Sequence, residues 1–309
     1  MPLANEYQVM FEQLAAAGPA PSVRDLPVAD GRNLYRAARA VNLDLPIHKV
    51  SNALLPGPGG DIPIRIYQPH GDGPFGILVY FHGGGWVIGD LDTADAVCRE
   101  IATLAEVIVV SVDYRLAPEH VYPAAVQDSY AALQWVNDNL ETLQGNGKIG
   151  VGGESAGGNL AAVVAQQSRD RGGPPIAFQC LLYPVTDAEM SRPSYSENSS
   201  GYLLETTTME WFWDTYCPDL EQRLNADASP LRAKNLADLP PALVVTAEFD
   251  PLRDEGNAYA HALQAAGNSA TLMCCEGLVH DFFSTAAVFG CSRGPFEKTI
   301  NALREHLNS

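Results

Sequence analysis

The stretch KIGVGGESAGGNLAAVVAQQ, residues 148–167, has the pattern of an apolar strand, a glycine-flanked turn and an Ala-rich helix. Ser155 lies in the turn, inside the pattern G-x-S-x-G. In a strand–turn–helix context this pattern predicts a nucleophile elbow, in which strained backbone angles expose the serine oxygen. Glycine suits the flanking positions because side chains there would collide with neighbouring elements. The helix that follows would also direct its N-terminal N–H groups at developing negative charge.

Strand-like and helix-like segments alternate on both sides of this turn. Eight apolar or β-branched runs predict strands, at residues 48–55, 62–68, 76–81, 107–112, 148–153, 176–183, 242–247 and 270–275. Helices are predicted over 92–104, 123–140, 156–170, 253–267 and 294–307. The alternation predicts an α/β fold with an eight-stranded, mostly parallel sheet flanked by helices. Because the first two strands are close in sequence, we expect them to form an antiparallel hairpin.

Two regions interrupt the alternation. Residues 1–45 contain short helical stretches and no strand, and residues 187–230 are a polar stretch followed by a run with Trp211, Phe212 and Trp213. An insertion between sheet strands is a natural place for a lid over a ligand site, although its aromatic residues could equally anchor it to the core. We therefore divide the chain into an N-terminal cap segment (1–45), a first part of the core (46–186), a cap insertion (187–230) and a second part of the core (231–309).

Composition excludes several classes of protein. The 309 residues are 46% hydrophobic and 18% charged, as in ordinary globular proteins. A net charge of −18 argues against a nucleic-acid partner and against an anionic membrane surface, because both need a basic patch. No signal peptide is visible in the first 21 residues, and no apolar run is long enough to span a bilayer. We expect a cytoplasmic protein whose six cysteines are reduced.

A second glycine-rich motif, VYFHGGGWVIGD at 79–90, follows another predicted strand. Consecutive glycines leave backbone N–H groups accessible, so we expect the N–H groups of Gly83, Gly84 and Ala156 to form an oxyanion hole. The alternative is a simple glycine-rich turn. His82 precedes the elbow in sequence, and we interpret it as a residue that organises the loop and not as a base.

A serine nucleophile needs a base and an orienting carboxylate. Of the three histidines after the elbow, His261 and His306 fall within predicted helices and are expected to be solvated, whereas His280 lies in a loop after a strand. Asp250 also follows a strand, while its competitor Asp254 falls in the next helix as a capping or ion-pairing residue. The order serine, aspartate, histidine along the chain is that of α/β-hydrolases.

Five motifs in this order make the chain resemble the bacterial hormone-sensitive lipase family (family IV) of esterases, which has the α/β-hydrolase fold. They are HGGGW, DYRLAPEHVYPAA, GESAGGNLA, DPLRDEG and GLVHDF. The resemblance runs from about residue 45 to the C-terminus. It implies an eight-stranded core with a helical cap, hydrolysis of acyl esters, and no cofactor or metal. It also implies that Ser155 is the nucleophile, Asp250 the acid and His280 the base, with the oxyanion hole at Gly83, Gly84 and Ala156.

The chain departs from the family pattern at Glu154, where Asp is more usual before the serine. We expect the longer carboxylate to change the local hydrogen bonds without affecting the mechanism. Around the second motif, we interpret the charged residues as a structural ion-pair network; they are Asp113, Arg115, Glu119 and Asp128. The segment GNGKIG, 145–150, matches a dinucleotide-binding fingerprint, but it precedes a strand and follows a helix, so we interpret it as a loop.

The expected activity is therefore a serine carboxylesterase that hydrolyses short- to medium-chain acyl esters. An amide or aryl-formamide hydrolase of the same fold remains open, because the acyl-enzyme chemistry is shared. From another class, a non-catalytic small-molecule receptor is disfavoured because serine, acid and base are all present. The expected partner is a small ester. A homodimer is also compatible with the sequence, since the last strand offers an open edge.

Overall fold

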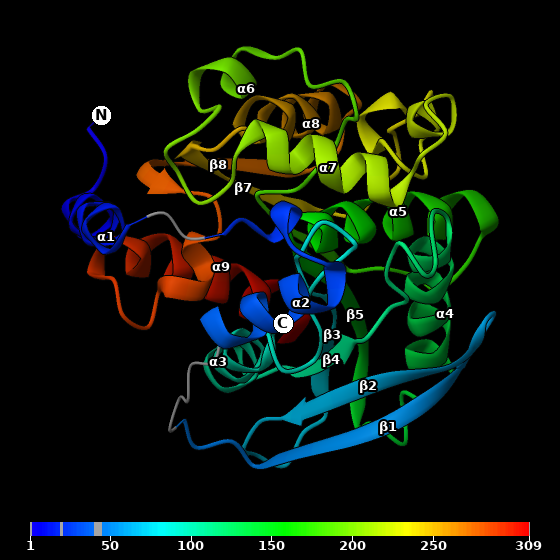
Figure 1. The fold of residues 1–309 in the computed structure, drawn as a ribbon. Coiled ribbons are helices and arrows are strands. Elements are labelled where there is room, and N and C mark those ends of the chain that lie inside the picture. Colours follow the sequence, from blue (N-terminus) through cyan, green and yellow to red (C-terminus); the bar gives the residue numbers. More distant parts are fainter. Residues whose placement is uncertain (1, 19–20, 40–44, 309) are drawn as a thin grey trace.

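The computed structural model describes residues 2–18, 21–39 and 45–308 (Figure 1). In these residues one sheet has the strand order β1-β2-β4-β3-β5-β6-β7-β8. The strands are β1 (Lys49–Gly57), β2 (Gly60–Gln68), β3 (Phe75–Phe81), β4 (Ile108–Val112), β5 (Gly145–Glu154), β6 (Phe178–Leu182), β7 (Ala242–Phe249) and β8 (Ala270–Val279). β1, β2 and β4 pair antiparallel and every later pair is parallel, which confirms the predicted sheet and its hairpin.

Helices cover both faces of this sheet (Figure 1). The described helices are α1 (Asn5–Ala17), α2 (Val28–Ala38), α3 (Asp95–Ala105), α4 (Ala124–Asp138), α5 (Ala156–Arg171), α6 (Pro193–Glu197), α7 (Thr206–Tyr216), α8 (Arg253–Ala265) and α9 (Gly290–Asn308). α3 and α9 pack against one face, and α4, α5 and α8 against the other. Because both faces are covered, strands such as β3 and β4 are buried along their whole length, as their continuous apolar sequences predict.

The centre of the sheet brings the elbow sequence into place. β5 begins at Gly145, three residues earlier than predicted, so all of GNGKIG lies in a strand and the prediction of a loop was wrong. A register shift against β3 marks this early part, which explains why it lacks an ordinary strand pattern. α5 is buried from Ala156 to Ser168 and ends at Gly172, whose φ of 58° is left-handed. Small alanines let a helix lie this close to the sheet on several sides.

The two regions outside the alternation are helical, as predicted. α1 and α2 precede β1, and α6 and α7 lie between β6 and β7. Arg24, in a single 3₁₀ turn before α2, donates 3.0 Å hydrogen bonds to Glu205 Oε2 and to Thr208 Oγ1, and so joins the N-terminal region to the insertion. Phe212 and Trp213 are buried within the core and Trp211 is partly exposed, so two of the three aromatic residues anchor the insertion.

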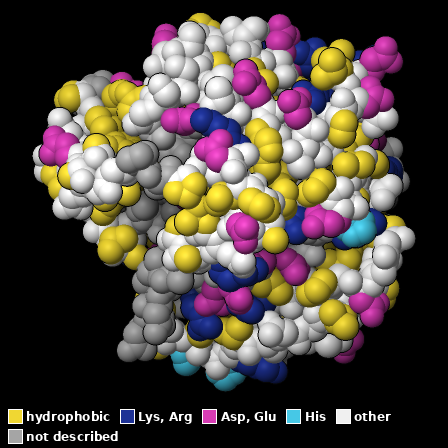
Figure 2. Space-filling model, viewed as in Figure 1, with side chains coloured by type: hydrophobic (Ala, Val, Ile, Leu, Met, Phe, Trp, Pro, Cys, Tyr) yellow, Lys and Arg dark blue, Asp and Glu magenta, His cyan; other side chains and the backbone are white. Residues whose placement is uncertain are grey.

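The face of the molecule in Figure 2 carries charged side chains of both signs. On the face seen in Figure 2, Lys and Arg side chains lie beside Asp and Glu side chains, with hydrophobic side chains between them. None of the described helices combines the length and the apolar character that a bilayer span requires. All six cysteines are free thiols.

Candidate active site

Ser155 lies at the tip of a tight turn between β5 and α5. Its φ of 56° and ψ of −117° are unfavourable for a residue with a side chain. Its N–H group donates a 2.9 Å hydrogen bond to Leu182 O at the end of β6, which holds the turn against the sheet. A Cβ atom at Gly157 would come within 2.6 Å of His82 O, so only glycine allows this close approach. The strained elbow that the sequence predicts is confirmed in its backbone geometry.

Asp250 and His280 are brought together by the two strands that precede them. Asp250 directly follows β7 and His280 directly follows β8, and adjacent parallel strands end at the same edge of a sheet. The Nδ1 atom of His280 is 2.7 Å from Asp250 Oδ2. Asp250 is fully buried, and its other oxygen accepts a 2.9 Å hydrogen bond from Leu252 N–H. This carboxylate can therefore fix both the tautomer and the orientation of the imidazole.

The pKa of His280 results from two opposed effects. Burial lowers it, because desolvation disfavours the imidazolium, whereas the charge and hydrogen bond of Asp250 raise it. The carboxylates of Asp281 and Glu154 add to the rise, and the net pKa lies above the ordinary 6.5. A raised pKa makes the neutral imidazole a stronger proton acceptor.

The competing residues have other roles in the structure. Asp254 accepts hydrogen bonds from Ser194 N–H at 2.9 Å and from Arg253 Nε at 2.8 Å, which confirms the predicted ion pair. His261 is exposed, as expected. His306 is not simply solvated: its ring stacks on Phe178 with centroids 4.2 Å apart, so that prediction was wrong.

The glycine-rich loop after β3 lies beside the elbow. Gly84 has a φ of 115°, a conformation that favours glycine, and its carbonyl accepts the N–H groups of Val87 and Ile88. The N–H groups of Gly84 and Ala156 donate to no acceptor among the described residues. The N–H of Gly83 differs, since it lies 3.4 Å from Glu154 Oε1 in a long hydrogen bond. The three predicted oxyanion donors are therefore not equivalent in the unliganded chain.

His82 holds this loop, as the sequence suggests. Its ring stacks on Tyr114 at 4.3 Å, and Nδ1 donates to Gly83 O at 2.7 Å. Burial lowers the pKa of His82, so the imidazole is neutral at pH 7. A neutral donor next to the glycines stabilises the loop without adding a charge.

The charged residues after β4 form two separate contacts and not one network. Arg115 pairs with Asp128 at 2.7 Å, as predicted. Glu119 pairs instead with Arg32 of α2 at 2.7 Å, and no ion pair of Asp113 is found among the described residues. The prediction was therefore partly wrong, because the partner of Glu119 is 87 residues away in the sequence.

Glu154 takes part in a buried cluster that sequence reasoning did not find. Arg39, at the end of α2, reaches Glu154 Oε1 at 3.3 Å and Asp281 Oδ1 at 2.6 Å. Tyr183 Oη donates to Glu154 Oε2 at 3.2 Å, and the Tyr183 ring contacts the His280 ring at 4.8 Å. The only signal in the sequence was the unusual carboxylate at position 154. Nothing local pointed to Arg39.

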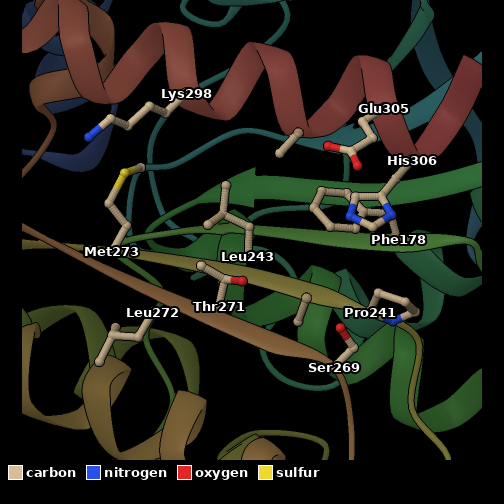
Figure 3. A pocket seen from close by; sticks show the side chains of 12 residues that line it. Phe178, Pro241, Leu243, Ser269, Thr271, Leu272, Met273, Lys298, Glu305 and His306 are labelled. Carbon is tan, nitrogen blue, oxygen red and sulfur yellow. The ribbon is translucent and has the colours of Figure 1, made fainter.

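A hollow of about 370 Å³ lies elsewhere, between α9 and the sheet (Figure 3). Figure 3 shows Lys298, Glu305 and His306 of α9 across from Thr271 and Met273 of β8. Its wall includes the residues that begin β6 and β7, whereas Ser155, Asp250 and His280 follow the other ends of their strands. The hollow is therefore separate from the candidate active site. Within the described ranges, no three His, Cys, Asp or Glu side chains are grouped so as to hold a metal ion.

Comparison with known proteins extends these observations. A family model described as the α/β-hydrolase fold matches residues 78–284. The carboxylic ester hydrolase LipN of Mycobacterium tuberculosis is 45% identical over 266 residues, covering 84% of this chain and 71% of the relative. The ethyl acetate hydrolase of Pseudomonas putida is 35% identical over 311 residues, 97% of each chain. The solved structure of a hyperthermophilic esterase from the archaeon Pyrobaculum calidifontis has a TM-score of 0.93 at 41% identity and covers 99% of both chains.

Proposed function

The chain belongs to the α/β-hydrolase family, in its hormone-sensitive lipase branch of carboxylic ester hydrolases, and on this premise we propose that it cleaves acyl esters through an acyl-enzyme on Ser155. The observation that supports this most directly is the 2.7 Å hydrogen bond between His280 and the buried Asp250, at the edge of the sheet where Ser155 follows β5. A base oriented by a carboxylate is what a serine hydroxyl needs to become a nucleophile.

The proposed reaction has two steps. In the first, Ser155 Oγ attacks the ester carbonyl, His280 Nε2 accepts the hydroxyl proton, and the imidazolium returns it to the departing alcohol. In the second, His280 activates a water molecule, which attacks the acyl-enzyme and releases the acid. The N–H groups of Gly84 and Ala156 would stabilise the oxyanion in both steps. The N–H of Gly83 would join them once it leaves Glu154 Oε1, to which it is bound at 3.4 Å.

We further propose short- to medium-chain acyl esters as substrates. The Phe212 ring lies directly on Gly85, since a Cβ added there would overlap it. Trp86 next to it is buried and stacks on Tyr216, with centroids 4.2 Å apart. We infer that these rings limit the space beside the glycine-rich loop for a long acyl chain. Hydrolysis of a small ester by the relative named ethyl acetate hydrolase agrees with this proposal.

The decisive experiment compares the wild-type chain with S155A on p-nitrophenyl acetate, butyrate, octanoate and palmitate. We expect the wild type to hydrolyse the short esters fastest and S155A to lose at least about 10³-fold in kcat with an unchanged circular dichroism spectrum. An organophosphate should add one covalent group at Ser155 of the wild type, measured by mass spectrometry. Full activity of S155A would refute the assignment, and a wild type that neither hydrolyses nor becomes labelled would favour a receptor.

Amide and aryl-formamide substrates belong in the same assay, because they would proceed through the same acyl-enzyme. A kcat/KM for p-nitroacetanilide or an aryl formamide above that for the matched acetate ester would move the assignment from esterase to amidohydrolase. We expect the ester to be preferred, since the relatives described above are named as ester hydrolases.

A further inference from the structure

The buried Arg39 joins the two segments that carry the proposed nucleophile and base. One guanidinium nitrogen contacts Glu154, the residue before Ser155, and another contacts Asp281, the residue after His280. Glu154 is the last residue of β5 and Asp281 follows β8, and these two strands are separated by β6 and β7 in the sheet. A single side chain therefore bridges the strand ends whose separation decides whether serine and imidazole can meet.

The bridge is held at more than one point. The Arg39 guanidinium lies 5.0 Å from the centre of the Tyr35 ring, which fixes it from the side of α2. Tyr183 closes the other side, because it donates to Glu154 while its ring contacts His280. The backbone of Asp281 is also constrained, because its φ of 69° lies in the left-handed region. A short 3₁₀ helix begins directly after this residue.

The charges of this cluster do not cancel. Glu154 and Asp281 bring two carboxylates, and Arg39 brings one positive charge. The side chain of Arg39 is 10% exposed and that of Glu154 is 2% exposed, so solvent screens these charges weakly. Ion pairs in this setting lose much more when one partner is removed than surface pairs do, because the remaining charge is left buried.

We propose that Arg39 is a positioning residue for the proposed ester hydrolysis, which fixes the Ser155 turn and the His280 turn relative to each other through Glu154 and Asp281. The inference rests on the proposed function and adds to it a requirement for the N-terminal region. Among the described residues, the polar contacts of Arg39 are with Glu154 and Asp281 and not with Ser155 or His280. Its effect passes through the neighbours of Ser155 and His280, and a bidentate guanidinium suits this task better than an ammonium group.

The same arrangement affects the base electrostatically. The titratable and charged groups that surround the cluster come from α2, β3 and the turns after β6, β7 and β8; they are Tyr35, Tyr80, Tyr183, Asp250 and His280. Burial raises the pKa of Asp281 to about 6, and Arg39 opposes this rise. Because both carboxylates raise the pKa of His280, loss of the Asp281 charge should lower it.

The experiment measures kcat, KM and the pH profile of kcat/KM on p-nitrophenyl butyrate for the wild type, R39Q, R39K, D281N and R36Q. Arg36 lies on the same helix and pairs with Asp90 through a 2.8 Å hydrogen bond from Nε, but it is largely exposed, which makes R36Q a matched control. We expect R39Q to lose about 10- to 100-fold in kcat with little change in KM, as for misplaced catalytic groups. R39K should recover part of this loss, and R36Q should remain within about twofold of the wild type.

The pH profiles distinguish positioning from simple stabilisation of the fold. The acid limb should move to lower pH in D281N, because the carboxylate that raises the pKa of His280 is lost, while R39K should keep the wild-type limb. Melting temperatures identify any variant that is not folded at the assay temperature. If R39Q is unfolded there, the kinetics of R39K and D281N test the proposal instead. Wild-type kcat in R39Q, or equal losses in R39Q and R36Q, would overturn the proposal. Activity in S155A would instead refute the esterase assignment itself, so the two failures are distinguishable.

Discussion

At Ser155 the backbone is held in a conformation that an L-amino acid adopts reluctantly. With φ at 56° and ψ at −117°, the residue has an energetic penalty on the order of 1–3 kcal/mol. The hydrogen bond to Leu182 O and the close approach of Gly157 to the loop after β3 maintain it. In the proposed reaction, strain of this kind would orient the hydroxyl before a substrate arrives.

This strain predicts a difference between two inactive variants. S155A retains a Cβ and therefore the strain, whereas S155G removes it and also gains flexibility in the unfolded chain. Since relief of strain is the larger effect, S155G should be about 1 kcal/mol more stable than S155A. Urea denaturation followed by tryptophan fluorescence measures the difference. A variant S155G that is less stable than S155A would mean that the turn is not strained.

The His280–Asp250 pair predicts the position of the acid limb of the pH profile. Only neutral imidazole can accept the Ser155 proton, so activity falls as the pH drops through the pKa of His280. Asp250 raises that pKa, so the wild-type limb should lie above 6.5. In D250N the raising charge is lost, and the limb should move to lower pH while kcat falls by about 10³- to 10⁴-fold. Stopped or continuous assays from pH 4.5 to 9 test both; a limb that stays in place would contradict the pairing.

At the scale of elements, α7 shows how one helix serves both packing and the site. Phe212 is buried against Gly85 and Trp211 beside it is partly exposed. F212A should destabilise the protein by about 3–5 kcal/mol, because it leaves a cavity in well-packed surroundings. W211A should lose clearly less. Thermal or urea unfolding of both variants gives the comparison.

The same substitution tests the proposed acyl preference. If the Phe212 ring limits the space beside the glycine-rich loop, F212A should increase the ratio of octanoate to acetate hydrolysis, whereas W211A should leave this ratio unchanged. A ratio that is the same in F212A and the wild type would mean that the ring only anchors the helix.

Local sequence predicted those elements whose contacts are local. The eight strands, the hairpin, and the turns at Ser155, Asp250 and His280 follow from short apolar runs ended by Gly, Pro or Asp. Sequence did not predict that Glu119 pairs with Arg32, or that Arg39 reaches residues 115 and 242 positions away. An ion pair across such a distance leaves no periodicity in either segment, and only the packing of α2 on the core determines it. The start of β5 was missed because a register shift removes its strand pattern.

At the scale of the whole molecule, the strand order places the candidate catalytic residues at one edge of the sheet, while helices packed on both faces bury the core. β5, β7 and β8 end at the same edge of the sheet, and Arg39 from the N-terminal region reaches Glu154 and Asp281 there. Arg32 of α2 also ties the N-terminal region to the loop after β3, because its Nε donates a 2.8 Å hydrogen bond to Val87 O. Such an arrangement couples activity to the folding of distant segments, and buried charged groups make this coupling depend on pH.

Glu255 of α8 is a buried carboxyl group through which the free energy of unfolding should depend on pH. It is fully buried, and its carboxyl group accepts Thr186 N–H at 2.7 Å and Tyr195 Oη at 2.8 Å, so it ties α8 to the segment that leaves β6. Burial raises the pKa of Glu255 to about 8 from an ordinary 4.5. The folded state therefore retains a proton that the unfolded state has lost, and the contribution of Glu255 to the free energy of unfolding should decline as the pH rises from about 4.5 to about 8.

The variant E255Q tests this expectation, because a glutamine can accept the Thr186 N–H and donate to Tyr195 without titrating. The free energy of unfolding of E255Q should fall less than that of the wild type between pH 5 and pH 8, measured by urea denaturation at several pH values. E197Q is a suitable control, since Glu197 forms an exposed ion pair with Arg253 and its removal should leave the wild-type slope. Parallel slopes for E255Q and the wild type would show that Glu255 is already ionised in the folded protein.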